Sequence, residues 1–284
     1  MIIKVKQTKA TIKNKFEIEI NNELKYLAGS PWMDIDLPFG LENVRSDVIT
    51  DTDGNIRFLT SYDIARNITE SLIPMKWLVT GEQKKGIYWI CDGENNICGR
   101  FYKAKNDVFD AKFVIEYGVY SLKCYDVAAG KTRNIMIYNE GTQIAEMVKP
   151  LSSVNNLDEY YIFLLDEYSE LAPVISFFAV YFDRKYYANS GEIAVKKKRV
   201  SVEYTFDKNN SYYDKKWIAN NFDAEAVEAI YSDMKKKRDS NSKSIKKGAK
   251  ILGLTIGLAW LIILAGTALY YYLNGYFSCG PNMM

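Results

Sequence analysis

The sequence predicts a mainly β protein, with a closed antiparallel β-barrel around a central hydrophobic helix, then a helical stalk and one C-terminal transmembrane helix. Three observations predict this fold. Residues 1 to about 150 repeat alternating apolar and polar runs separated by short turns, as antiparallel strands do. An apolar segment of helical length follows. The chain then ends in a long apolar run behind a basic segment.

Four hairpins can be read from the first half of the chain. Phe16, Ile18 and Ile20 alternate with glutamates and lead into a turn at Asn21 and Asn22. The other three hairpins turn at 51–55, 92–96 and 126–130. Asn, Asp and Gly tolerate the positive φ of a tight reversal. The strands should therefore form an antiparallel meander.

The next segment, about residues 157–188, predicts a helix that is apolar on nearly every side. Pro173 marks either the first turn of a new helix or a kink between two helices. The apolar run 171–182 has only twelve residues, too few to cross a membrane. A helix without a polar face must be surrounded by protein, so we expect the strands of residues 1–206 to close around it.

The C-terminal end predicts a membrane anchor. Residues 251–284 contain no charged side chain, whereas 235–250 carry seven Lys, one Arg and one Asp. As a helix, the apolar run 251–273 would extend roughly 35 Å, enough for a hydrocarbon core of about 30 Å. Lys and Arg collect on the cytosolic side of a span. We therefore expect a tail-anchored, single-pass membrane protein with a cytosolic domain, a partly helical basic stalk at 207–250 and a short non-cytosolic tail at 274–284; a buried apolar helix is the alternative.

Composition excludes several classes of protein. The chain has no histidine, which removes Ser-His-Asp and Cys-His catalysis and the usual zinc sites. Residues 1–234 carry a net charge of about −5, which disfavours nucleic-acid binding. The cysteines Cys91, Cys98, Cys124 and Cys279 lack zinc-site spacing, and we expect free thiols in the domain. We predict no catalytic residue, no metal and no cofactor.

Two basic clusters are candidate contacts for anionic lipid headgroups, each gaining on the order of 1 kcal/mol per residue near such a surface. The first could equally be the solvated start of a strand, and the second a simple topology signal. Gly253 and Gly257 have the spacing that lets two helices approach closely, which predicts a weak homodimer through the transmembrane helix. The basic residues are Lys196, Lys197, Lys198, Arg199, Lys235, Lys236, Lys237, Arg238, Lys243, Lys246, Lys247 and Lys250.

The predicted turn at 51–55 is also a candidate metal-binding loop. Asp51, Asp53 and Asn55 place alternate oxygens around Gly54, as calcium loops do. However, Gly54 comes too early for an EF-hand loop, and no distal Glu is in register. A hairpin turn is the preferred interpretation.

Strand repeats at 16–22 and 48–56, the opening Ile3-Lys-Val-Lys-Gln7 and a hydrophobic helix ending at Arg184 together resemble the tubby C-terminal-like superfamily. The LURP-one-related and phospholipid scramblase branches are the most similar. The resemblance covers roughly residues 1–190 and implies a closed barrel of about twelve strands around a central hydrophobic helix. No stretch matches the acidic calcium segment of the scramblases.

From the pattern, the anchor and this resemblance, we expect a membrane-tethered, non-enzymatic tubby-like module. It would bind lipid headgroups, a small ligand or a protein partner on the cytosolic face. A scramblase-like lipid transport protein is the alternative. An enzyme that uses carboxylates alone is a third hypothesis. A pair such as Asp34 and Asp36 does not support it without a defined geometry.

Overall fold

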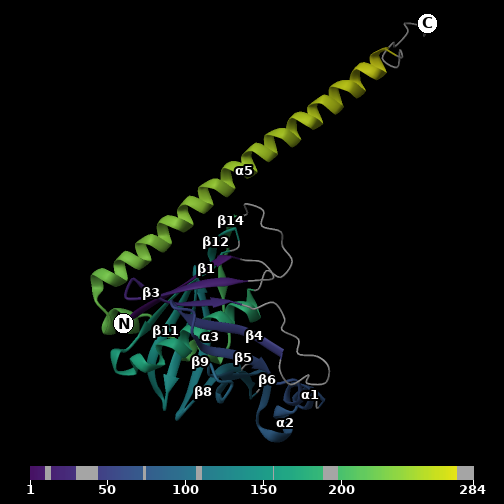
Figure 1. Cartoon of the computed structure of the whole chain (residues 1–284). Helices are drawn as coiled ribbons and strands as arrows, with labels where there is room; N and C mark the ends of the chain where they lie inside the picture. Colours follow the sequence, from purple (N-terminus) through teal and green to yellow (C-terminus); the bar gives the residue numbers. More distant parts are fainter. Residues whose placement is uncertain are drawn as a thin grey trace, which may run out of the picture. The chain divides into compact units, whose positions relative to one another are not determined.

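The strands of the first half pair antiparallel in chain order, and β10 pairs with both β9 and β11, so the sheet closes on itself (Figure 1). The computed structural model describes residues 1–9, 14–29, 44–72, 75–106, 111–155, 157–187 and 198–273, without the side chains of 44–46, 248, 251–254 and 271–273. The barrel has twelve strands, β1 to β11 and β13. The predicted closed antiparallel barrel is therefore confirmed.

The barrel strands are β1 (Ile2–Lys9), β2 (Lys15–Ile20), β3 (Glu23–Gly29), β4 (Val44–Asp51), β5 (Ile56–Tyr62), β6 (Gln83–Cys91), β7 (Ile97–Lys105), β8 (Ala111–Tyr117), β9 (Tyr120–Gly130), β10 (Thr132–Asn139), β11 (Thr142–Pro150) and β13 (Glu159–Leu164). Three short strands lie outside the ring: β12 (Ser152–Val154), β14 (Lys198–Val200) and β15 (Glu203–Tyr204). The helices are α1 (Ile64–Leu72), α2 (Trp77–Thr80), η2 (Asp166–Leu171), α3 (Ala172–Tyr186), η3 (Lys208–Tyr212), α4 (Trp217–Asn221) and α5 (Ala224–Leu273).

Three of the four predicted turns are confirmed. Asn21 and Asn22 both have positive φ, and Asp51 accepts backbone hydrogen bonds from Asp53 and Asn55 within its turn. The fourth prediction, a turn at 126–130, is wrong because β9 continues through it to Gly130. The strand persists there because Tyr125 and Val127 pack on the outside of the barrel while Cys124 packs inside.

The central helix is α3, and its side chains form one hydrophobic core with the inward faces of the strands. Phe177, Phe178 and Phe182 are fully buried, and Phe178 contacts Phe101 and Phe113 of the barrel wall. The helix begins at Ala172, later than the predicted position near 157, because 159–164 forms strand β13. That strand is buried on both faces, and a short run buried on both faces has no diagnostic periodicity.

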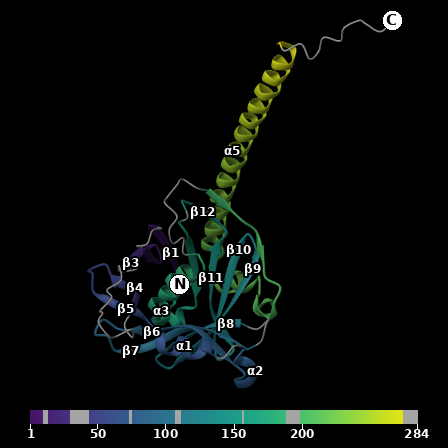
Figure 2. The ribbon, with the colours of Figure 1, turned by 90° about the vertical axis from the view of Figure 1, so that its right-hand side faces the viewer.

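The barrel has two unlike ends. At one end the connections are short hairpin turns, such as those at Asn21 and Gly141. At the other end, here called the mouth, β1, β3, β5, β7, β9 and β11 finish, and α3 ends at Tyr186. The α1–α2 excursion between β5 and β6 also lies there (Figure 2). The mouth therefore collects the long connections, which is where binding residues usually lie in a rigid scaffold.

The C-terminal part of the compact unit covers the outside of the barrel. That unit comprises residues 1–238, so the first part of the predicted stalk belongs to it. Ile218 and Met234 pack on Val148, Tyr161 and Phe163 of β11 and β13. Among these outward side chains, Glu146 of β11 is also buried. Burial, together with the nearby charge of Asp214, raises the pKa of Glu146 to about 8.

The prediction of a transmembrane helix is wrong. No helix in the described residues is long and apolar enough to cross a membrane. The tail anchor, the single-pass topology and the membrane localisation with a cytosolic domain are corrected with it. The tail at 274–284 lies outside the described residues.

We predict that Glu146 makes the barrel less stable as the pH rises. A carboxyl whose folded pKa is about 8, against an ordinary value of 4.5, favours folding fully below pH 4.5 and loses that contribution as the pH approaches 8. The loss should reach up to about 1.4 kcal/mol per pH unit. Urea unfolding of wild type and Glu146→Gln between pH 7 and 8 measures it, since the raised pKa of Asp183, about 7, contributes mainly at lower pH. Equal slopes for the two proteins would contradict the prediction.

Candidate functional site

The mouth carries ionisable side chains that point into the barrel. Each lies two residues from a core residue of a barrel strand, and residues two apart in extended chain share a face. Lys149 follows Met147 on β11, and Arg133 precedes Ile135 on β10. The whole set is Lys103, Asp126, Arg133, Lys149 and Asp158. The apolar interior thus ends in a polar layer around the C-terminus of α3.

Three ion pairs, made by Lys149 and Arg133, organise this layer. Lys149 Nζ lies 2.6 Å from Asp158 Oδ1, and both side chains are almost fully buried. Arg133 joins two carboxylates, with Nε 2.7 Å from Asp126 and an Nη 3.0 Å from Glu203. Removing a buried ion from water is costly, and only its partner and hydrogen bonds offset that cost. The Lys149–Asp158 pair is therefore tightly constrained in position.

Aromatic side chains enclose the Lys149 ammonium. It lies 4.0 Å from the ring centroid of Tyr187 and 5.5 Å from that of Tyr160. Arg133 donates a hydrogen bond of 2.9 Å to the Tyr187 hydroxyl, which fixes this ring over the lysine. A cation over an aromatic face is stabilised by the ring's charge distribution. Tyr187 therefore links Lys149 to Arg133.

A buried carboxyl of α3 lies behind the pair. Tyr160 donates a hydrogen bond of 2.6 Å to Asp183 Oδ1, while Asp183 Oδ2 is buried and receives none from the described residues. Burial, reinforced by the charge of Asp158, raises the pKa of Asp183 to about 7, against the opposing effects of Tyr160 and Lys149.

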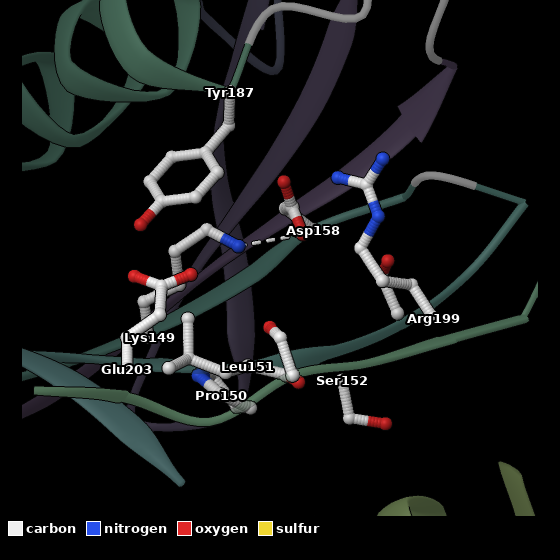
Figure 3. A pocket seen from close by; sticks show the side chains of 10 residues that line it. Lys149, Pro150, Leu151, Ser152, Asp158, Tyr187, Arg199 and Glu203 are labelled. Atoms are coloured by element: carbon white, nitrogen blue, oxygen red, sulfur yellow. Dashed lines mark hydrogen bonds and ion pairs between the residues drawn. The ribbon is translucent and has the colours of Figure 1, made fainter. Parts of the chain in front are cut away.

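A cavity of about 280 Å³ opens beside these groups, here called the mouth pocket (Figure 3). In that view Arg199 and Glu203 lie on opposite sides of the Lys149–Asp158 pair. The guanidinium of Arg199 is exposed and makes no ion pair or hydrogen bond within the described chain. The lining residues are Lys149, Pro150, Leu151, Ser152, Ser153, Asp158, Tyr187, Arg199, Ser201 and Glu203.

The structure separates the two predicted basic clusters. Lys198 and Arg199 lie on β14, which pairs with β12 beside the mouth pocket, whereas Lys196 and Lys197 lie outside the described residues. On α5, Lys237 pairs with Glu159 and Asp233, and Arg238 donates to the backbone oxygen of Ser201. The remaining α5 lysines of this set are exposed: Lys235, Lys236, Lys243, Lys246, Lys247 and Lys250.

The structure adds little support to the other predicted sites. A Cβ added at Gly257 would meet no described atom within 4 Å, and the surroundings of Gly253 lie outside the description. Helix pairing through these glycines stays a prediction, now without a transmembrane helix to support it. Asp34 and Asp36 also lie outside the described residues. No cluster of metal-ligand type occurs among the residues that are described.

Sequence reasoning missed Lys149, Asp158, Asp183 and Tyr187. The alternation along the strands could have identified two of the mouth residues. Lys149 and Arg133 occupy inward-facing positions of strands whose other inward-facing residues in the core are apolar. A charged residue at an inward-facing position indicates that the apolar interior of the barrel ends there. Nothing in the sequence, however, indicates that Asp158 would lie against Lys149, since the pairing depends on the register of β11 and β13.

We predict that breaking the buried ion pair destabilises the fold. Lys149→Met leaves the Asp158 carboxylate buried without its partner, which should cost about 3–5 kcal/mol of unfolding free energy. Replacing both residues, Lys149→Met with Asp158→Leu, should cost clearly less than the single change. Urea titrations of the three proteins at pH 7 give these values. A double variant as unstable as Lys149→Met would show that the pairing does not explain the loss.

Comparison with known proteins finds no relative for this chain. No family model matches the sequence, and no curated protein and no solved structure matches it significantly. The assignment of function therefore rests on the geometry of the mouth.

Proposed function

We propose that the protein is a non-enzymatic, tubby-like binding module whose mouth pocket holds a small ligand with an anionic group. The observation that carries the proposal is Arg199, an exposed guanidinium without an ion-pair partner in the described chain, on the wall of a polar cavity. An unpaired guanidinium offers its fork of N–H donors to a carboxylate or phosphate. Ser201 and Tyr187 add hydroxyl groups to the wall.

The rigid surroundings of the pocket support binding. Lys149, Asp158 and Glu203 are held in ion pairs, so their side chains are ordered before a ligand arrives. A site that needs little ordering loses less free energy when it binds. The other cation of the described lining, Lys149, is engaged by the Asp158 carboxylate. These features favour a binding role over a catalytic one.

Lipid transport, the alternative expected from the sequence, finds less support. Moving acyl chains requires an apolar path, but the described barrel interior is filled by α3, with Phe177, Phe178 and Phe182 fully buried. The proposal also needs no membrane tether. The anionic group could belong to a free metabolite or to a lipid headgroup, and the test distinguishes these two sources.

We predict that Arg199→Ala weakens anion binding by the full-length protein. Calorimetric titration with inorganic phosphate and with sn-glycerol 3-phosphate should show a loss of about 10-fold to 100-fold, the usual range for a hydrogen bond to a charged group. Co-sedimentation with phosphatidylglycerol vesicles separates a headgroup from a free anion. Arg57→Ala is the matched control, because Arg57 is another exposed arginine, on the β4–β5 hairpin at the other end of the barrel. Binding that survives Arg199→Ala unchanged would refute the proposal.

A further inference from the structure

The wall of the mouth pocket that carries Arg199 lies outside the barrel ring. It is formed by β12 and β14, a separate two-stranded sheet in which three residues of each strand pair. A two-stranded sheet is at best marginally stable by itself. Next to this sheet the Ser201 nitrogen donates 2.9 Å to the Leu151 oxygen, and β15 then pairs with β9 over two residues. The position of Arg199 therefore depends on contacts from other elements.

Helix α5 supplies such a contact through Arg238. An Nη of Arg238 donates 3.0 Å to the Ser201 oxygen and 3.5 Å to the Leu151 oxygen. Leu151 precedes β12 and Ser201 follows β14, and both line the mouth pocket. A hydrogen bond from a charged donor is stronger than one between neutral groups. Arg238 thus joins the two segments of the wall beside their short sheet.

The preceding residue of α5 attaches the helix to the barrel. Lys237 Nζ lies 2.7 Å from a carboxylate oxygen of Glu159, at the start of β13, and 2.9 Å from one of Asp233. Glu159 follows Asp158, the pocket carboxylate that pairs with Lys149. Two consecutive residues of α5 therefore connect the β12–β14 wall to the strand beside the buried ion pair.

Arg238 acts on the pocket from behind. It is not among the residues that line the pocket, so it affects a ligand there only through the wall. It is also the last residue of the compact unit, and α5 continues beyond it to Leu273. The contacts of Lys237 and Arg238 are thus the last ones that α5 makes before it enters the second unit.

We propose that Arg238, supported by Lys237, is a positioning residue for Arg199, so that docking of the first part of α5 on the barrel regulates anion binding at the mouth pocket. This inference rests on the proposed function, because it concerns the same pocket. A guanidinium that is already in place loses less free energy on binding. The coupling is reciprocal, since an anion that prefers the docked state stabilises docking by the same factor.

We predict that Arg238→Ala weakens phosphate binding by the full-length protein about 10-fold, the effect of losing a hydrogen bond to a charged group. Arg199→Ala should then cost much less in the Arg238→Ala background than in wild type, because a misplaced Arg199 contributes little. Calorimetric titration of wild type, both single variants and the double variant with inorganic phosphate measures this coupling. Arg238→Lys, which can still donate to the Ser201 oxygen, should recover most of the affinity. Lys215→Ala is the matched control, because the Lys215 side chain is exposed and makes no ion pair or hydrogen bond within the described chain.

Hydrogen exchange of the ligand-free protein tests the positioning itself. Arg238→Ala should speed amide exchange in 151–154 and 199–204 and leave β7 unchanged, whereas a general loss of stability would speed both. Unchanged exchange in the wall would overturn the inference, as would additive effects of Arg238→Ala and Arg199→Ala on phosphate affinity. If Arg199→Ala weakens binding and Arg238→Ala does not, the proposed function stands and the inference is wrong. Wild-type protein that binds no phosphate would refute the proposed function and the regulation together, and exchange alone would then decide whether Arg238 holds the wall.

Discussion

A helix that is apolar on every side, enclosed by a sheet that closes on itself, is the constraint on which the structure depends. A ring of twelve strands is wider than its own inward side chains can fill, because barrels of about eight strands are already just filled. The aromatic side chains of α3 occupy that volume, with Phe178 within 6 Å of the ring centres of both Phe101 and Phe113. Conversely, α3 has no polar face with which to meet water. Helix and ring therefore require each other.

Enclosing the helix creates a special place where it ends. The inward positions of the strands continue past the last turn of α3, and there the apolar residues give way to Lys103, Asp126, Arg133, Lys149 and Asp158. Charges so far from water persist only in pairs or with shifted pKa values, and both solutions occur. Arg133 and Lys149 are paired, while burial raises the pKa of Asp183. Lys149 and Asp158 of this layer also line the mouth pocket, so the position of its buried ion pair follows from the closure of the barrel.

The outside of the barrel is covered by two different means. Segments from the C-terminal part lay apolar side chains such as Ile218 and Met234 on β11 and β13, and this cover also buries Glu146. Helix α1 is attached to β6 by hydrogen bonds of Asn67 and Glu70 instead, which leaves Ile68 and Leu72 facing outward. The C-terminal segments thus bury their apolar side chains within the compact unit. The hydrogen-bonded attachment of α1 leaves its apolar side chains exposed.

The sequence by itself determined the strands of four hairpins, three of their turns, the need to enclose an apolar helix and the absence of histidine chemistry, because period-two alternation and turn residues are local properties. It did not determine where β13 ends and α3 begins, since a strand buried on both faces and a buried helix are both uniformly apolar. Its long apolar C-terminal run predicted a span that the described residues do not support. Only the tertiary structure placed Lys149 against Asp158 and turned Asn67 inward, because strand register and helix rotation depend on partners far away in the chain.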